Sequence, residues 1–294
     1  MVGSMTRRVG LIALAGSMVS ACSPLSLFAT FVPKDAARSP EHGVAFGPDP
    51  RQRLDVYAPR HETAPAPVAV FFYGGSWDSG RRQDYGWVGR ALAAQGFLTI
   101  VPDYRLYPAV RYPGFVEDGA LAVRWAADHA RALGGDPSRI VLIGHSAGAY
   151  NAAMLALDDR YLKAAGVDPK VVRAFAGLSG PYDFLPLDGP ITRRTFGDYP
   201  DLPATQPGAY ARASSPPAFL ATGDADTTVK PRNTKALAAA LRAQGVAVEE
   251  RHYGGLNHAD TVLALSRPLR GKAPVLSEMV GFLEAQVADP LAPT

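Results

Sequence analysis

Near-continuous apolar segments that alternate with helix-like segments are the feature that most constrains how this chain folds. A strand that is buried on both faces has such a composition, whereas a half-exposed strand alternates polar and apolar residues. Six segments are interpreted as strands: residues 68–73, 97–101, 140–143, 171–178, 218–222 and 246–253. Five segments between and after them have helical periodicity: residues 87–95, 115–133, 147–157, 231–244 and 274–287. This order predicts an α/β fold, with a mostly parallel central sheet and helices on both faces.

Residues 53–57 differ from these segments, because polar and apolar residues alternate along them. We therefore interpret them as a half-exposed strand at an edge of the sheet. The predicted domain spans residues 43–290, a length that α/β proteins commonly use as one domain. Within it, the proline-rich residues 183–215 are expected to form a short cap-like insertion near the functional site.

The composition excludes several classes of protein. Of the 294 residues, 47% are hydrophobic and 19% charged, which is too apolar for a disordered chain. Cys22 is the only cysteine, so neither an intramolecular disulfide nor a four-cysteine zinc site can form. The formal net charge of +3 includes Arg7 and Arg8, and no dense basic run remains downstream. We therefore expect no nucleic-acid partner.

The N-terminus has the pattern of an export signal. Arg7 and Arg8 precede an uncharged apolar run over residues 9–21, which is too short to span a bilayer. The run ends in Val-Ser-Ala followed by Cys22, which resembles the bacterial lipobox, whose cysteine is lipidated. Residues 1–21 are thus expected to be a lipoprotein signal peptide, and residues 22–42 a loop-like tether. This predicts a lipid-anchored protein of the bacterial cell envelope, at the outer membrane or the periplasmic face. Plain secretion with an incidental cysteine is the alternative.

A G-x-S-x-G pentapeptide, Gly-His-Ser-Ala-Gly over residues 144–148, lies between a predicted strand and a predicted helix. This context is typical of a nucleophile elbow, a tight turn that exposes a serine hydroxyl. A structural Gly-rich turn is the alternative. We expect Ser146 to be the nucleophile.

A serine needs a base, and the base needs an acid that orients it. Asp224 and Asp226 both follow the strand at residues 218–222, and Asp226 is favoured because Asp224 lies directly at the turn. His258 follows the last strand in a loop, free to approach the serine. His252 lies within that strand, which would hold it away. The predicted triad is Ser146, Asp226 and His258.

The segment Tyr-Gly-Gly-Ser-Trp over residues 73–77 follows another predicted strand. Glycines allow backbone N–H groups to turn toward a site without obstruction by side chains. We expect the N–H groups of Gly75, Ser76 and Ala147 to form an oxyanion hole. A simple Gly-Gly turn between a strand and a helix is the alternative.

These motifs together resemble the α/β-hydrolase superfamily, and within it the BD-FAE-like carboxylesterases that carry HGGxW after the third strand. The resemblance covers about residues 44–288. It is carried by residues 74–77, 102–106, 144–148 and 180–183, together with Asp226 and His258. The family's D-x-x-V pattern matches Asp226 and Val229. Tyr73 departs from the family, which usually has a histidine before the glycines.

The resemblance implies ester hydrolysis by a serine triad that needs neither a metal nor an organic cofactor. An amide hydrolase of the arylformamidase type and a non-catalytic binding protein remain as alternatives. Trp77, Phe184 and Phe196, together with Tyr199, are candidates for the wall of a substrate pocket. They are equally able to attach the insertion to the core. Because the insertion is short, we expect small esters with aryl or short acyl groups rather than bulky triglycerides.

Overall fold

The central feature of the computed structural model is one eight-stranded sheet with the order β1-β2-β4-β3-β5-β6-β7-β8. The structure describes residues 24–61 and 65–288. From β4 through β3 to β8 in this order, neighbouring strands are parallel. β1 and β2 are antiparallel to their neighbours. The strands are β1 Arg38–Ala45, β2 Arg53–Ala58, β3 Ala66–Phe72, β4 Leu98–Pro102, β5 Gly135–His145, β6 Val172–Leu178, β7 Ala218–Gly223 and β8 Val248–Tyr253. The predicted α/β fold with a mostly parallel sheet is confirmed.

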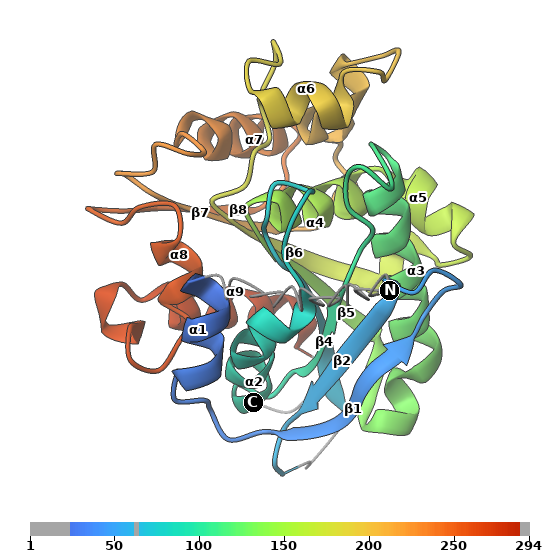
Figure 1. Cartoon of the computed structure of the whole chain (residues 1–294), viewed down its shortest axis with the longest axis vertical. Helices are drawn as coiled ribbons and strands as arrows, with labels where there is room; N and C mark the ends of the chain where they lie inside the picture. The colour runs from blue at the N-terminus through green and yellow to red at the C-terminus, as the bar shows by residue number, and fades with distance from the viewer. Residues whose placement is uncertain (1–23, 62–64, 289–294) are drawn as a thin grey trace, which may run out of the picture.

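Helices cover both faces of the sheet, with α2 and α9 on one face and α3 and α4 on the other (Figure 1). The α-helices are α1 Pro24–Phe31, α2 Gly86–Ala94, α3 Gly114–His129, α4 Ala147–Leu157, α5 Asp159–Ala164, α6 Pro190–Phe196, α7 Arg232–Ala243, α8 Asp260–Leu263 and α9 Val275–Val287. The central strands are almost fully buried between these layers, which explains their continuous apolar sequences. In the described residues no helix is both long enough and apolar enough to cross a bilayer.

The prediction that residues 53–57 form an edge strand is wrong. β2 lies between β1 and β4, and only Arg53 in it is exposed. The polar residue responsible for the alternation is Asp55, whose side chain points into the protein rather than into solvent. Its carboxylate accepts a hydrogen bond from the Gly43 N–H at 2.8 Å and pairs with Arg82 at 3.0 Å. A buried, paired carboxylate thus gives the sequence the same polar–apolar alternation as a residue that faces solvent.

The prediction of a loop-like tether over residues 22–42 is also wrong where the structure describes them. Helix α1 and the beginning of β1 lie within this range. The ring of Phe28 lies 5.4 Å from that of Trp87, and Asp35 pairs with Arg270 at 2.8 Å. Proline is tolerated in the first turn of a helix, so Pro24 marks the start of α1 rather than a loop. Cys22 and the predicted signal peptide lie outside the described residues.

The chain after β6 forms the cover over one end of the sheet. Residues 183–215 contain α6 and two short 3₁₀ turns, Pro203–Thr205 and Pro207–Tyr210. In Figure 1 this segment lies beside α7 at the top of the molecule. Because strands β3, β5, β6, β7 and β8 are parallel, the loops at their carboxyl ends all open at this same edge. The predicted site residues Gly75, Ser146, Asp226 and His258 all belong to those loops.

Candidate active site

Ser146 occupies a sharp turn between β5 and α4. Its backbone has φ 54° and ψ −125°, a left-handed conformation that a residue with a Cβ rarely adopts. The flanking glycines make this turn possible. A Cβ on Gly144 would lie 2.2 Å from the Gly148 carbonyl oxygen, and one on Gly148 would lie 2.1 Å from that of Phe72. The pentapeptide therefore needs glycine at both positions, and the turn holds the serine at the carboxyl end of the sheet.

The structure brings Ser146, His258 and Asp226 together in one chain of hydrogen bonds. Nε2 of His258 lies 2.8 Å from Oγ of Ser146, and Nδ1 lies 2.8 Å from Oδ2 of Asp226. The other carboxylate oxygen of Asp226 accepts the N–H groups of Thr228 at 3.0 Å and Val229 at 2.8 Å. Both oxygens of the acid are therefore fixed, and its side chain is fully buried.

The electrostatics of this acid suit an orienting role. Burial raises the pKa of the Asp226 carboxyl, but hydrogen bonds from His258 and from the Val229 N–H outweigh it and hold the pKa below its usual range. The acid is thus a carboxylate that can only accept hydrogen bonds. It places the ring proton of His258 on Nδ1 and leaves Nε2 free to accept the serine proton.

His252 and Asp224, the alternatives that the sequence offered, take no part in this series of hydrogen bonds. Nδ1 of His252 is 3.4 Å from Oδ1 of Asp224, and its Nε2 is 2.8 Å from Oε1 of Glu250. Asp224 is exposed. Because these residues contact one another and not Ser146, the geometry favours Asp226 as the acid and His258 as the base.

The predicted oxyanion loop has an unusual backbone. Gly75, Ser76 and Trp77 have positive φ values of 129°, 52° and 60° in succession. A Cβ on Gly75 would lie 2.3 Å from the Ser79 carbonyl oxygen, so only glycine fits there. Within the described part of the chain, the N–H groups of Gly75, Ser76 and Ala147 donate to no acceptor. They remain available to an oxygen of a bound substrate, as an oxyanion hole requires.

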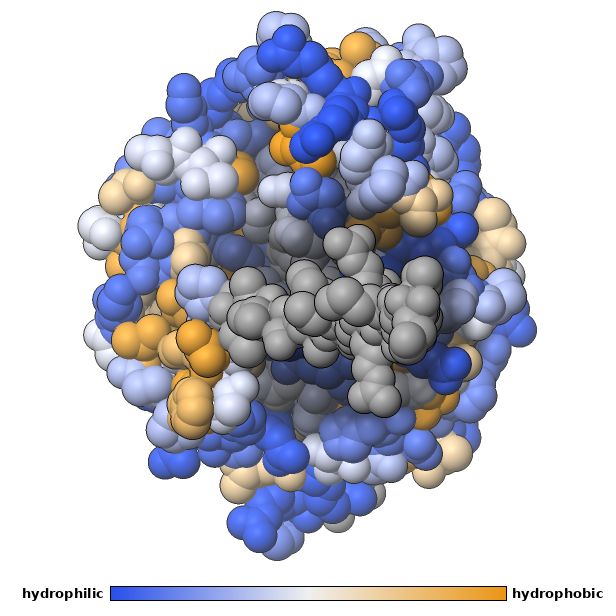
Figure 2. All heavy atoms as spheres, viewed as in Figure 1, coloured by the Kyte–Doolittle hydropathy of each residue, from blue (hydrophilic) through white to orange (hydrophobic). Residues whose placement is uncertain are grey.

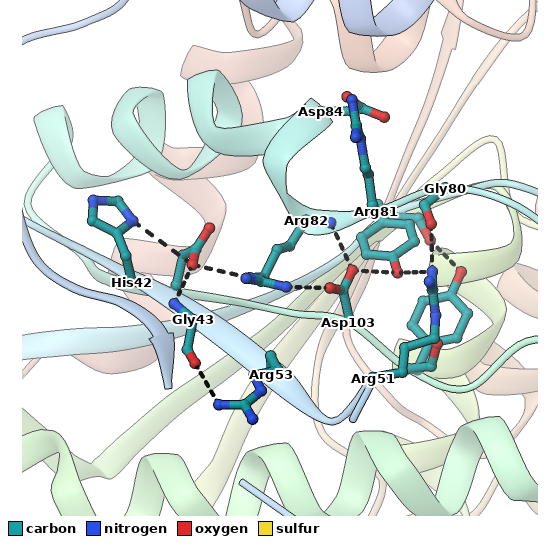
Figure 3. A network of polar contacts seen from close by, with 12 residues as sticks. His42, Gly43, Arg51, Arg53, Gly80, Arg81, Arg82, Asp84 and Asp103 are labelled. Atoms are coloured by element: carbon teal, nitrogen blue, oxygen red, sulfur yellow. Dashed lines mark hydrogen bonds and ion pairs between the residues drawn. The ribbon is translucent and has the colours of Figure 1, made fainter. Parts of the chain in front are cut away.

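A buried network behind this loop was not predicted from the sequence (Figure 3). The Tyr73 hydroxyl donates to Oδ1 of Asp103 at 2.7 Å, and the Arg82 N–H donates to the same oxygen at 2.7 Å. Arg51 donates to the Tyr73 hydroxyl at 3.1 Å and to the Gly80 carbonyl oxygen. The loop over residues 74–80 is therefore held at both ends. The departure of Tyr73 from the family pattern was the only sequence signal.

His145, inside the pentapeptide, was also missed as a functional residue. Its Nε2 donates to the backbone carbonyl oxygen of His258 at 3.0 Å, which connects the turn of the nucleophile to the loop of the base. Burial and the neighbouring His258 lower the pKa of His145 to about 3, so the ring is neutral near pH 7. Its Nδ1 is buried and has no partner among the described residues.

A cavity of about 240 Å³ opens onto Ser146. Trp77 and Phe184 line it, as do Ser76 and Ala147 of the predicted oxyanion hole. A larger cavity of about 480 Å³ is lined by other residues, Arg105, Glu117 and Tyr161 among them. That larger cavity contains no triad residue, so we place the substrate in the smaller one. In the described residues, no group of three or more His, Cys, Asp or Glu side chains could hold a metal ion.

Phe196 and Tyr199 do not line the cavity at Ser146, contrary to expectation. Phe196 is 1% exposed and packs behind Trp77, with ring centroids 4.9 Å apart. Tyr199 lies against Tyr112 at 4.7 Å. Both rings form edge-to-face contacts with other aromatic side chains, and such pairs contribute about 0.5–1.5 kcal/mol beyond the burial of area. These two residues attach the insertion to the core.

A serine at a strand–helix turn, followed by an acid and a histidine after later parallel strands, is the arrangement of an α/β-hydrolase. A truncated carbohydrate esterase from gut microbiota has the same fold, with a TM-score of 0.77 at 18% identity over 88% of this chain and 99% of that one. The sequence model of the BD-FAE family matches residues 54–241. The chain belongs to the BD-FAE family, as the resemblance in the sequence indicated.

Two esterases are also similar to this chain in sequence. An isoprenylcysteine alpha-carbonyl methylesterase of Arabidopsis thaliana is 30% identical over 286 residues, which cover 90% of this chain and 66% of that protein. Carboxylesterase NlhH of Mycobacterium tuberculosis is 33% identical over 231 residues, or 70% of each chain. The chain spans between about half and two thirds of the length of the plant methylesterases that it matches.

Proposed function

We propose that this protein hydrolyses carboxylic esters with Ser146, His258 and Asp226 as its catalytic triad. The observation that carries the proposal is the unbroken chain of 2.8 Å hydrogen bonds from Asp226 through His258 to Ser146. The names of the relatives, a methylesterase and a carboxylesterase, agree with this chemistry.

The mechanism follows from these contacts. His258 takes the proton of Ser146 as its oxygen attacks the ester carbonyl, while Asp226 stabilises the imidazolium that forms. The N–H groups of Gly75, Ser76 and Ala147 donate hydrogen bonds to the developing oxyanion. The bond between the carbonyl carbon and the alcohol oxygen then breaks as His258 protonates the leaving alcohol, and the acyl group remains on Ser146. The same histidine activates a water that hydrolyses the acyl-enzyme and releases the acid.

The cavity supports small substrates. Its volume of about 240 Å³ is below the roughly 300–1,000 Å³ of sites for drug-sized ligands. Trp77 and Phe184 provide an apolar wall beside the serine. We therefore propose esters with an aryl group or a short acyl chain.

The test is hydrolysis of 4-nitrophenyl acetate, butyrate and octanoate, with N-formylkynurenine assayed in parallel. We expect the short esters to be preferred and Ser146→Ala to lose nearly all turnover with an unchanged melting temperature, since the residual rate comes only from binding and the oxyanion hole. Wild-type kcat in Ser146→Ala would refute the triad. A clear preference for N-formylkynurenine would instead identify an amide hydrolase.

We further propose that the protein is exported and anchored to a membrane by lipid at Cys22. The lipobox-like sequence supports this, and so does the apolar surface of α1, which begins two residues after Cys22. Leu27 is 49% and Phe31 79% exposed, and Figure 2 shows apolar residues at the place that α1 occupies in Figure 1. The full chain should fractionate with membranes and Cys22→Ser should not. Mass spectrometry that finds an unmodified Cys22 would refute the anchor.

A further inference from the structure

The wall of the catalytic cavity carries charge that the proposed chemistry does not use. Lys230 and Arg232 both line the cavity that contains Ser146. Both are exposed, and neither side chain has a hydrogen-bond or ion-pair partner in the part of the chain that the structure describes. Arg82 and Arg105 differ from them, because each pairs with a buried carboxylate. Two unpaired cations beside a nucleophile can bind an anion.

Hydrogen bonds fix the backbone that carries these two residues relative to the triad. The Val229 N–H donates to Asp226, which fixes the residue before Lys230. The Lys230 carbonyl oxygen accepts the N–H of Asn233 at 3.0 Å, and the side-chain oxygen of Asn233 accepts the N–H of Tyr182 at 2.9 Å. The start of α7 is therefore attached both to the loop of the catalytic acid and to the loop after β6.

One carboxylate opposes these cations. Asp188 lines the same cavity and is exposed, and no other described residue pairs with its carboxylate. Asp226 does not line the cavity, and its buried carboxylate is hydrogen-bonded to His258 and to the Thr228 and Val229 N–H groups. The unpaired side chains of the wall thus carry two positive charges and one negative charge, so the wall is net positive.

We infer that the cavity selects esters that also carry a carboxylate, which binds at Lys230 and Arg232 while the ester lies at Ser146. This inference rests on the proposed ester hydrolysis and names its substrate class. Trp77 and Phe184 provide a surface for the part of the substrate between the two groups. A single benzene ring substituted at opposite ends suits a cavity of about 240 Å³. The carboxylate belongs either to the acyl part or to the alcohol part of the ester.

The experiment compares kcat/KM within two matched pairs of esters, in which a neutral amide replaces the carboxylate. The acyl-side pair is monomethyl terephthalate and methyl 4-carbamoylbenzoate. The alcohol-side pair is 4-acetoxybenzoate and 4-acetoxybenzamide. We expect the anionic member to be favoured at least threefold in one pair at low salt, and the preference to shrink in 0.5 M NaCl, which screens exposed charges.

Three variants test which residues cause the preference. Lys230→Met and Arg232→Gln should each lower the ratio of anionic to neutral kcat/KM about two- to fivefold, as expected for exposed ion pairs. Asp188→Asn removes the opposing charge and should raise the ratio. Lys235→Met is the matched control, because Lys235 is an exposed lysine of α7, five residues after Lys230, that does not line the cavity.

The possible failures are distinguishable. Normal hydrolysis of the neutral esters without any preference for the anion overturns this inference alone, as does a preference that Lys230→Met and Arg232→Gln leave unchanged. Failure to hydrolyse any of the four esters, together with the 4-nitrophenyl esters, overturns the proposed function as well.

Discussion

At the scale of single residues, the choice between Asp226 and Asp224 is decided by contacts rather than by sequence position. Asp226→Asn should lower kcat roughly 10²–10⁴-fold, because an amide no longer fixes the tautomer of His258. Asp224→Asn, two residues away, should keep near wild-type kcat, since Asp224 contacts His252 and not the triad. Steady-state kinetics of both variants measure this. A greater loss in Asp224→Asn would reverse the assignment.

His145 predicts how stability depends on pH. A histidine has a pKa of about 6.5 when unfolded, and burial lowers the pKa of His145 to about 3. Between these values the unfolded chain binds the proton more strongly, so stability falls as the pH falls from about 6.5 toward 3. The loss contributed by His145 should be about 3 kcal/mol at pH 4.5, at ~1.4 kcal/mol per pH unit.

Urea unfolding at pH 7.0 and 4.5 measures this dependence, with His145→Gln as the comparison. The amide of glutamine does not titrate and can still donate to the His258 carbonyl oxygen. The variant should therefore lose less stability than the wild type between the two pH values, even if it is less stable at pH 7. Equal losses would show that His145 is protonated in the folded protein.

At the scale of structural elements, the oxyanion loop depends on the network that holds its two ends. Burial, Tyr104 and Asp103 raise the pKa of the Tyr73 phenol, which therefore remains a donor to Asp103. Tyr73→Phe should lower the free energy of unfolding by about 1–3 kcal/mol, because a buried carboxylate loses a donor. It should also lower kcat more than it changes KM, because the N–H groups of the loop act mainly on the transition state.

Tyr253→Phe is the matched control for this prediction. The Tyr253 hydroxyl donates to Oε2 of Glu278 at 2.7 Å, so its removal deletes the same kind of hydrogen bond on β8. This variant should lose stability and keep its kcat. If both variants lower kcat equally, Tyr73 has no positioning role.

The elements that could be predicted from the sequence are those whose pattern is local. The buried strands and α4 follow from apolar runs and from the glycines of residues 144–148, which no other residue can replace. β1 and α1 were missed because their contacts come from distant residues, such as Trp87 and Arg270. For the same reason, no local pattern indicates that Arg51 and Asp103 meet at Tyr73.

At the scale of the whole molecule, α1 changes the expected relation between the domain and a membrane. If Cys22 carries lipid, only Ser23 separates the lipid from α1, because the expected 21-residue tether is largely helix and strand. The domain then lies close to the bilayer, with the exposed Leu27 and Phe31 near the lipid. A flexible spacer would instead let the active site move far from the surface.

This arrangement requires α1 to be an integral part of the fold, which truncation can test. A chain that starts at Ala36 loses the buried Val32, the partly buried Phe28 that packs against the core, and the pair between Asp35 and Arg270. Loss of a partly buried aromatic and a buried aliphatic side chain costs several kcal/mol, so its melting temperature should fall by about 5–10 °C relative to a chain that starts at Pro24. Because Phe28 packs on Trp87, tryptophan fluorescence should change as well. Equal melting temperatures would show that α1 contributes no stability and serves as a tether after all.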